Sequence, residues 1–277
     1  MTERSFSCEF FPPRTDKGWE NLNSTLDEFQ ALSPDFISCT YGAGGSTQDG
    51  TSDTLKIIQS RNIAAAAHIT CIGSTQEKIR SLLDEYKNIG VSRLVALRGD
   101  LPEDQNETGE FAYANELVAF IREHYGDAFH IEVAAYPEMH PQAVGYSEDL
   151  QHFKTKVDAG TDSAITQYFF NIDAYLRFVD DCEKLHIDIP IVPGIMPITN
   201  YVQLARFSDA CGAEIPRWIR TRLQSYGEDL DSIREFGLDV VTALCEQLLS
   251  QNAPGLHFYS LNRSQPTATI WNNLGLR

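Results

Sequence analysis

Extended and helical patterns alternate along the whole of this 277-residue chain, and this alternation is the feature that most limits its fold. Eight extended segments are each followed by residues whose apolar side chains repeat at helical spacing. Eight strand–helix units with short connections are typical of a TIM barrel, which needs roughly 250 residues. We therefore predict an α/β fold, a single TIM (β/α)₈ barrel domain over residues 1–277. The expected strands are 5–11, 35–40, 63–70, 93–98, 130–136, 163–169, 189–192 and 255–261.

A doubly wound parallel sheet is the alternative fold. It would need a Gly-x-Gly-x-x-Gly turn early in the chain. The glycine cluster at 42–45 lacks that spacing. The sequence also contains no linker, low-complexity tract or repeated block beyond the strand–helix unit, so we expect one domain.

Composition limits the partners. The net charge is −17 and the isoelectric point is near 4.7, so nucleic acid and anionic membranes would be repelled. Six widely spaced cysteines exclude the common zinc and redox spacings and favour reduced thiols in a cytoplasmic protein. No signal peptide or membrane-spanning apolar run is present. We therefore expect small-molecule ligands, with no metal, no nucleic acid and no membrane.

The first expected strand ends in an acid. Its alternation places Phe6, Cys8 and Phe10 on one face and Ser7 and Glu9 on the other. The prolines at 12–13 end the strand, so Glu9 lies at its carboxyl end, where a barrel builds its active site. The apolar residues at 10–13 offer little water, and burial of this kind raises a carboxyl pKa.

Polar side chains follow the other expected strands as well. A ring of them at one end of a barrel indicates a cradle for a large organic cofactor or substrate. The chain lacks His-Glu-x-x-His, Gly-x-Ser-x-Gly and phosphate-loop motifs, which argues against a metal or acyl-transfer site. The ring comprises Glu9, Thr40, His68, Thr70, Arg98, Asp100, Tyr136, Glu138, His140, Gln167, Asn262 and Arg263.

Eight motifs in register give the chain a recognisable family likeness. Together they closely resemble methylenetetrahydrofolate reductases of the bacterial type, over essentially the whole chain. The motifs are EFFPPR at 9–14, TYGA at 40–43, HITC at 68–71, ALRGDLP at 96–102, AAYPEMHP at 134–141, KVDAG at 156–160, TQYFF at 166–170 and FYSLNR at 258–263.

The resemblance implies a flavoprotein oxidoreductase. FAD would take hydride from NADH or NADPH and pass it to 5,10-methylenetetrahydrofolate, giving the 5-methyl product used in methionine synthesis. Glu9 would be the catalytic acid, and Asp100 would tune the flavin. The implied FAD contacts are Thr40, His68, Arg98, Gly99, Asp100, Ala114, Tyr136, His140, Asp149 and Lys156. The implied substrate contacts are Glu9, Gln167, Gln203, Phe207 and Arg263.

The chain departs from the family pattern in two places. His152 and Thr155 stand where bacterial relatives often have Asn and Arg, so FAD is expected to bind more loosely or differently. The loop at 42–46 is richer in glycine than usual. A C-terminal regulatory domain like that of eukaryotic relatives is not expected. A homo-oligomer is expected, while the number of subunits and the choice between NADH and NADPH stay open.

Several alternatives remain at this level. The barrel could bind folate or flavin as a sensor or a partner-dependent subunit, or it could be a flavin enzyme acting on another amine. His68 and His140 could be buried imidazoles with structural partners, and Arg98 and Asp100 could form a structural ion pair. Tyr41, Tyr136 and Phe207 could simply pack. Arg263 is expected to need an anionic partner, because an unpaired buried guanidinium is costly.

Overall fold

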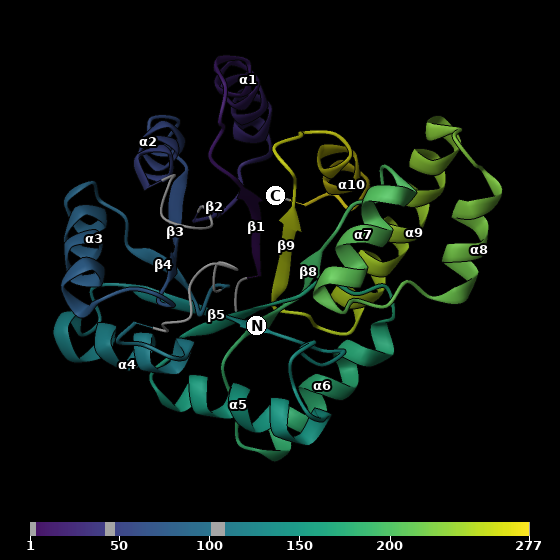
Figure 1. Cartoon of the computed structure of the whole chain (residues 1–277). Coiled ribbons are helices and arrows are strands. Elements are labelled where there is room, and N and C mark those ends of the chain that lie inside the picture. Colours follow the sequence, from purple (N-terminus) through teal and green to yellow (C-terminus); the bar gives the residue numbers. More distant parts are fainter. Residues whose placement is uncertain (1–3, 42–47, 101–108, 277) are drawn as a thin grey trace.

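The strands form a ring of parallel pairs surrounded by helices, as the computed structural model shows (Figure 1). The structure describes residues 4–41, 48–100 and 109–276. Within them the fold class is as predicted: a nearly closed parallel barrel of the TIM type. The strands are β1 Ser5–Phe10, β2 Phe36–Cys39, β3 Ala64–Thr70, β4 Arg93–Leu97, β5 His130–Ala135, β6 Ser163–Thr166, β7 Ile191–Val192, β8 Gly194–Ile195 and β9 Gly255–Tyr259.

Helices follow the strands and cover the outside of the ring (Figure 1). Several begin with a side-chain cap that satisfies a free backbone N–H, as Thr15, Thr75 and Asn171 do. Along the described residues no helix is long and apolar enough to cross a membrane. The helices are α1 Asp16–Leu32, α2 Gln48–Gln59, α3 Gln76–Asn88, α4 Ala114–Tyr125, α5 Tyr146–Asp158, α6 Ile172–Lys184, α7 Tyr201–Cys211, α8 Arg217–Ser225, α9 Leu230–Ser250 and α10 Thr267–Asn273.

The seventh expected strand, predicted over 189–192, covers only Ile191–Val192, and an additional short strand that was not predicted, β8, follows at Gly194–Ile195. Pro193 separates β7, which pairs with β6, from β8, which pairs with β9. A proline has no N–H to donate to a ladder, so the strand breaks there. Its carbonyl still accepts from the N–H of His257 at 2.9 Å, which helps to close the ring. At Gly194 a β-carbon would lie 2.1 Å from the Thr166 carbonyl oxygen, so only glycine fits this seam.

The two faces of β1 behave as its alternation predicts. Phe6, Cys8 and Phe10 are buried in the main core, between the barrel and the helices. Ser7 and Glu9 face the barrel interior, where β1 pairs with β2 and β9. A smaller apolar cluster fills the interior, made of Phe36, Ala66, Val95 and Ile165. The interior is therefore part apolar and part polar.

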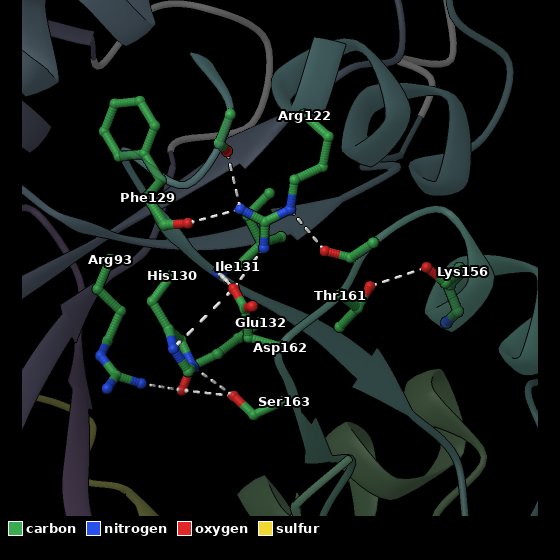
Figure 2. Close-up of polar contacts among 12 residues, drawn as sticks. Arg93, Arg122, Phe129, His130, Ile131, Glu132, Lys156, Thr161, Asp162 and Ser163 are labelled. Carbon is green, nitrogen blue, oxygen red and sulfur yellow. Dashed lines mark hydrogen bonds and ion pairs between the residues drawn. The ribbon is translucent and has the colours of Figure 1, made fainter. Parts of the chain in front are cut away.

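The amino-terminal end of the barrel holds a network of charged residues (Figure 2). Arg93 donates to Glu132 Oε1 at 2.7 Å, and its guanidinium lies 4.4 Å from the centre of the Phe36 ring. His130 Nε2 lies 2.8 Å from the hydroxyl of Ser163, which lies 3.4 Å from the same carboxylate oxygen. Glu132 is 2% exposed, and its Oε2 has no hydrogen-bond partner among the described residues.

A second arginine braces the same end. Arg122 of α4 donates to the carbonyls of Phe129 and Gly160, at 2.9 and 2.7 Å, and pairs with Asp162 (Figure 2). Asp162 also accepts from the N–H of Ile131 at 2.7 Å. These contacts join the starts of β5 and β6 to helix α4 and so hold the strands that carry the polar network.

Burial shifts the two titrating groups of this network in opposite ways. It raises the pKa of Glu132 from 4.5 to about 7, although Arg93 opposes the shift. It lowers the pKa of His130 from 6.5 to about 4, and Arg93 acts in the same direction. Glu132 therefore makes the free energy of unfolding fall as pH rises from about 4.5 to 7, because the unfolded state loses this proton first. His130 makes it rise between about 4 and 6.5, because the unfolded state binds a proton that the folded state does not.

Glu132→Gln is expected to remove the fall in unfolding free energy that Glu132 causes and to leave the rise that His130 causes. The difference in unfolding free energy between variant and wild type should rise by ~1–3 kcal/mol from pH 5 to pH 8. Urea unfolding at several pH values measures it. Glu246→Gln, at an exposed position on α9, is the control and should stay within ~0.5 kcal/mol of wild type throughout. A pH-independent difference for Glu132→Gln would show that this carboxyl does not titrate as described.

Candidate active site

Glu9 projects into the barrel at the carboxyl end of β1. Its Oε2 lies 3.4 Å from Nε2 of His68 and 4.0 Å from Nε2 of His257. In the ladders, Glu9 stands opposite Ser38 of β2 and Tyr259 of β9. Its side chain is 22% exposed, so the carboxyl is largely enclosed yet still reachable from the open end.

Both imidazoles beside Glu9 are buried. His257 is fully buried, and its Nδ1 lies 2.7 Å from the Ser7 hydroxyl. Nε2 of His68 lies 3.3 Å from the Ser38 hydroxyl. Burial lowers the pKa of each imidazole to about 3, so both are neutral near pH 7.

Glu9 therefore has no cation beside it to favour the carboxylate. Burial raises its pKa from 4.5 to about 8. The direction and its cause, desolvation, agree with the prediction, but Phe10 and Phe11 are not the residues that keep water from Glu9. Phe10 points outward and packs on Phe29, and Phe11 is 43% exposed. Side chains alternate along β1, so Glu9 points into the barrel while Phe10 points outward. The barrel interior, and not the apolar neighbours along the chain, therefore desolvates Glu9.

A second group of polar residues lies after β5 and on α5. Tyr136 and His140 meet edge to face, with ring centres 4.6 Å apart. The N–H of His140 donates to Asp149 Oδ2 at 2.8 Å. The ammonium of Lys156 lies 6.0 Å from the centre of the Tyr136 ring. These four predicted cofactor contacts thus share one site.

Lys156 has the properties of an anion-binding residue. Its ammonium donates to the Ala134 carbonyl at 2.5 Å and has no ion pair within the described residues. Burial lowers its pKa from 10.5 to about 8, and the charge of Asp149 opposes that shift. A half-buried cation without a carboxylate partner costs stability, so it fits a ligand that brings negative charge. The diphosphate of the predicted FAD is such a group.

Arg98 and Asp100 follow β4 and do not form the structural ion pair considered above. Arg98 Nε donates to the Gly99 carbonyl at 3.2 Å. Asp100 is exposed, and its charge acts on Tyr136 and His140. Gly99 has φ +82°, and a β-carbon there would lie 2.9 Å from Cβ of Thr70, so the turn requires glycine. The exposed tip of this turn places one cation and one anion at the rim.

The predicted substrate residues fall in three places. Gln167 follows β6, and its Oε1 accepts from the N–H of Tyr168 at 2.9 Å. Gln203 and Phe207 are both half-buried on α7. Arg263 is exposed, which corrects the expectation of a buried guanidinium that needs an anionic partner. A contact between Arg263 and a ligand stays a prediction.

Four further positions named in the sequence lie just after β2 and on α4 and α5. Thr40 follows β2, and its N–H donates to the Phe10 carbonyl at 2.9 Å. Ala114 is the first residue of α4 and is 9% exposed. His152 and Thr155 on α5 are both exposed, and the Thr155 hydroxyl donates to the Gln151 carbonyl at 2.9 Å. Nothing in the structure explains why these two residues depart from the family pattern. The glycine-rich loop at 42–46 lies outside the described residues.

Two residues that shape the site, both on β9, were not among those expected from the sequence. His257 and Tyr259 lie on the inward face of β9, and Tyr259 donates its hydroxyl to the Thr166 carbonyl at 2.8 Å. Alternation along β9 could have found both. Asn262 accepts from and donates to the backbone of Phe11, at 2.9 and 2.8 Å, so it ties the loop after β1 to the loop after β9. Among the described residues no cluster of three His, Cys, Asp or Glu side chains could hold a metal ion.

Comparisons with known proteins agree on one family. The family model for methylenetetrahydrofolate reductase matches residues 1–275. A 5,10-methylenetetrahydrofolate reductase of Pectobacterium carotovorum is 40% identical over 272 residues, which cover 98% of this chain and 90% of the relative. Methylenetetrahydrofolate reductase (NADH) 1 of Zea mays is 40% identical over 98% of this chain and 48% of its own length.

A solved structure supports the fold independently. An uncharacterised protein from Clostridium thermocellum, described as binding two copies of 5-methyl-5,6,7,8-tetrahydrofolic acid, superimposes with a TM-score of 0.69. The match covers 99% of this chain and 95% of that one at 16% identity. At that identity the match shows a shared barrel fold.

Lys156→Met is expected to stabilise the protein without its cofactor and to weaken cofactor binding. The lysine pKa is depressed on folding, so its cost is fully present below about pH 8 and disappears as pH rises toward 10.5. At pH 7 the variant should gain ~1–3 kcal/mol of unfolding free energy and lose ~10- to 100-fold in FAD affinity. Urea unfolding and fluorescence titration with FAD measure the two effects.

Lys154→Met is the matched control on the same helix. Lys154 pairs with Asp158 one turn along α5, and such pairs contribute only ~0.3–0.5 kcal/mol. Its removal should leave both quantities close to wild type. Unchanged FAD affinity in Lys156→Met would exclude Lys156 from the cofactor site.

Proposed function

The chain belongs to the methylenetetrahydrofolate reductase family, and from that premise we propose that it reduces 5,10-methylenetetrahydrofolate to 5-methyltetrahydrofolate. FAD would be the resident cofactor, and NADH or NADPH the hydride donor. Nicotinamide and folate would react in turn in a ping-pong sequence. The product would supply methyl groups for methionine synthesis. The name of the maize relative favours NADH over NADPH.

The raised pKa and the position of the Glu9 carboxyl support this proposal most strongly. The imidazolidine ring of the folate has to open before hydride can arrive, and opening requires a proton on N10. A general acid for that step must keep its proton near neutral pH. A carboxyl with pKa about 8, 22% exposed at the end of a barrel strand, meets the requirement. The neutral His68 and His257 beside it leave the proton on Glu9.

The residues on the β4 and β5 side fit the dinucleotide. Lys156 supplies positive charge from within the wall, and Arg98 supplies it at the rim. Asp149 holds the backbone of His140, which fixes the loop that also presents Tyr136. Thr40, His68, Gly99 and Ala114 complete the proposed set. When bound, FAD would supply the hydride transfer, which none of these side chains can perform.

Other residues would orient the substrates and adjust the cofactor. The exposed carboxylate of Asp100 would disfavour negative charge on a flavin ring beside it and so lower its potential. Gln167 and Gln203 would bind the folate, Phe207 would stack on the folate or the nicotinamide, and Arg263 would meet the glutamate tail. Each of these roles is positioning or electrostatic, which is the protein's usual contribution in a cofactor enzyme.

The cysteines and the net charge support a compartment and a class of partners. All six cysteines are unpaired, as expected for reduced thiols in the cytoplasm, where we place the protein. The acidic surface disfavours nucleic acid and anionic membrane as partners. The homo-oligomer stays a prediction.

Anaerobic stopped-flow measurements of the two half-reactions test the function through Glu9. Wild type should purify with FAD, be reduced by NADH or NADPH and be reoxidised by methylenetetrahydrofolate. Glu9→Gln should keep FAD and keep reduction within a few-fold, because that step needs no acid. Reoxidation by the folate should fall by ~10² or more.

Glu132→Gln is the matched control, because it neutralises the other buried barrel glutamate at the opposite end. It should leave both half-reactions unchanged. Reoxidation at the wild-type rate in Glu9→Gln would show that Glu9 is not the acid. A wild type that holds flavin but oxidises no nicotinamide would favour the sensor, and reoxidation by another amine would favour the second enzymatic alternative.

A further inference from the structure

A side chain between the two halves of the site has no assigned role. Glu138 lies in the loop after β5, two residues from Tyr136 and two from His140. Its Oε2 accepts from the backbone N–H of Glu214 at 2.8 Å. Glu214 follows α7, the helix of Gln203 and Phe207. One carboxylate therefore joins the loop on the cofactor side to the end of the helix on the substrate side.

Other contacts bring α7 close to the same loop. Gly212 ends the helix, and a β-carbon there would lie 3.0 Å from the ring of Pro141. Inside, the Ser208 hydroxyl of α7 lies 3.1 Å from the hydroxyl of Tyr168, just after β6. A cavity of about 10 Å³ remains between the loop, β6 and the end of α7. It is large enough for about one water molecule, so this is a joint between elements and not a ligand pocket.

The loop is held in a strained conformation. Met139 has φ +85°, which is rare for a residue with a long side chain. Its N–H donates to the Tyr136 carbonyl at 3.2 Å, and the next N–H, that of His140, donates to Asp149. Strain of this kind persists where the surroundings fix it, and it is common at functional sites. Here the turn directs Glu138 to the segment that follows α7 and the backbone of His140 to α5.

We propose that Glu138 is a positioning residue that fixes α7, and with it Gln203 and Phe207, relative to the cofactor loop. The inference rests on the proposed function, since it assigns those two side chains to the substrates. Glu138 is half-buried, and burial raises its pKa to about 7, while the hydrogen bond from Glu214 favours the ionised form. Desolvation of this carboxyl fits a structural link and not a solvated surface group.

Hydrogen exchange followed by mass spectrometry tests the link directly. Glu138→Ala should speed exchange of the amides in 207–214 by about tenfold, the loss expected for one hydrogen bond. Glu138→Gln retains an acceptor oxygen and should restore most of the protection. Glu214→Ala is the matched control, because the link uses only the backbone N–H at 214. It should exchange like wild type.

Steady-state kinetics test the consequence for the substrates. Glu138→Ala should raise KM for both nicotinamide and folate by about tenfold, leave kcat within about threefold and leave FAD retention unchanged. A change confined to melting temperature and FAD retention would indicate general destabilisation and overturn the positioning role. Unchanged exchange in 207–214 would overturn the link itself. If wild type neither binds folate nor turns over, the proposed function has failed, while the exchange measurement still decides the link.

Discussion

The burial of one carboxyl group inside the barrel is the constraint on which the proposed chemistry depends. Glu9 faces two imidazoles that burial keeps neutral, so its surroundings offer no charge to stabilise the carboxylate. Moving a carboxylate into such surroundings is costly, and the group retains its proton instead. The barrel makes this possible because β1 pairs with a strand on each side, so the side chains on its inward face can only project into the interior. The same geometry leaves Glu9 at the end of the barrel where a ligand can reach it.

The opposite end of the barrel handles a buried glutamate differently. Glu132 is also enclosed, but Arg93 lies 2.7 Å away and opposes the rise in its pKa. That pair belongs to the rigid base of the structure, together with Arg122 and Asp162. Two inward glutamates on one barrel thus have different roles because one has a cation beside it and the other has not. Lys156 shows the converse, a half-buried cation that has no carboxylate in contact.

Much of this could be predicted from the sequence. The strand–helix alternation fixed the barrel, and period-two alternation along β1 placed Glu9 correctly. Pro193 could have revealed the break in the seventh strand. The features that the sequence did not predict depend on contacts between residues far apart in the chain. The imidazole of His257 beside Glu9, for example, comes from β9, almost 250 residues away. Alternation can tell which face a side chain occupies but not which partners meet it there. For the same reason the sequence could not show that Arg263 is exposed or that Glu138 reaches Glu214.

The protonation state of Glu9 is the central claim, and its carboxyl carbon can be observed directly. Protein labelled with ¹³C at the glutamate side-chain carboxyl would be titrated by NMR, and the Glu9 resonance would be identified by its absence in Glu9→Gln. The structure predicts that this resonance titrates with a pKa of about 8, so that the group is mainly protonated at pH 7. Titration near 4.5, the ordinary value for a glutamate, would mean that Glu9 is ionised at neutral pH and cannot serve as the acid.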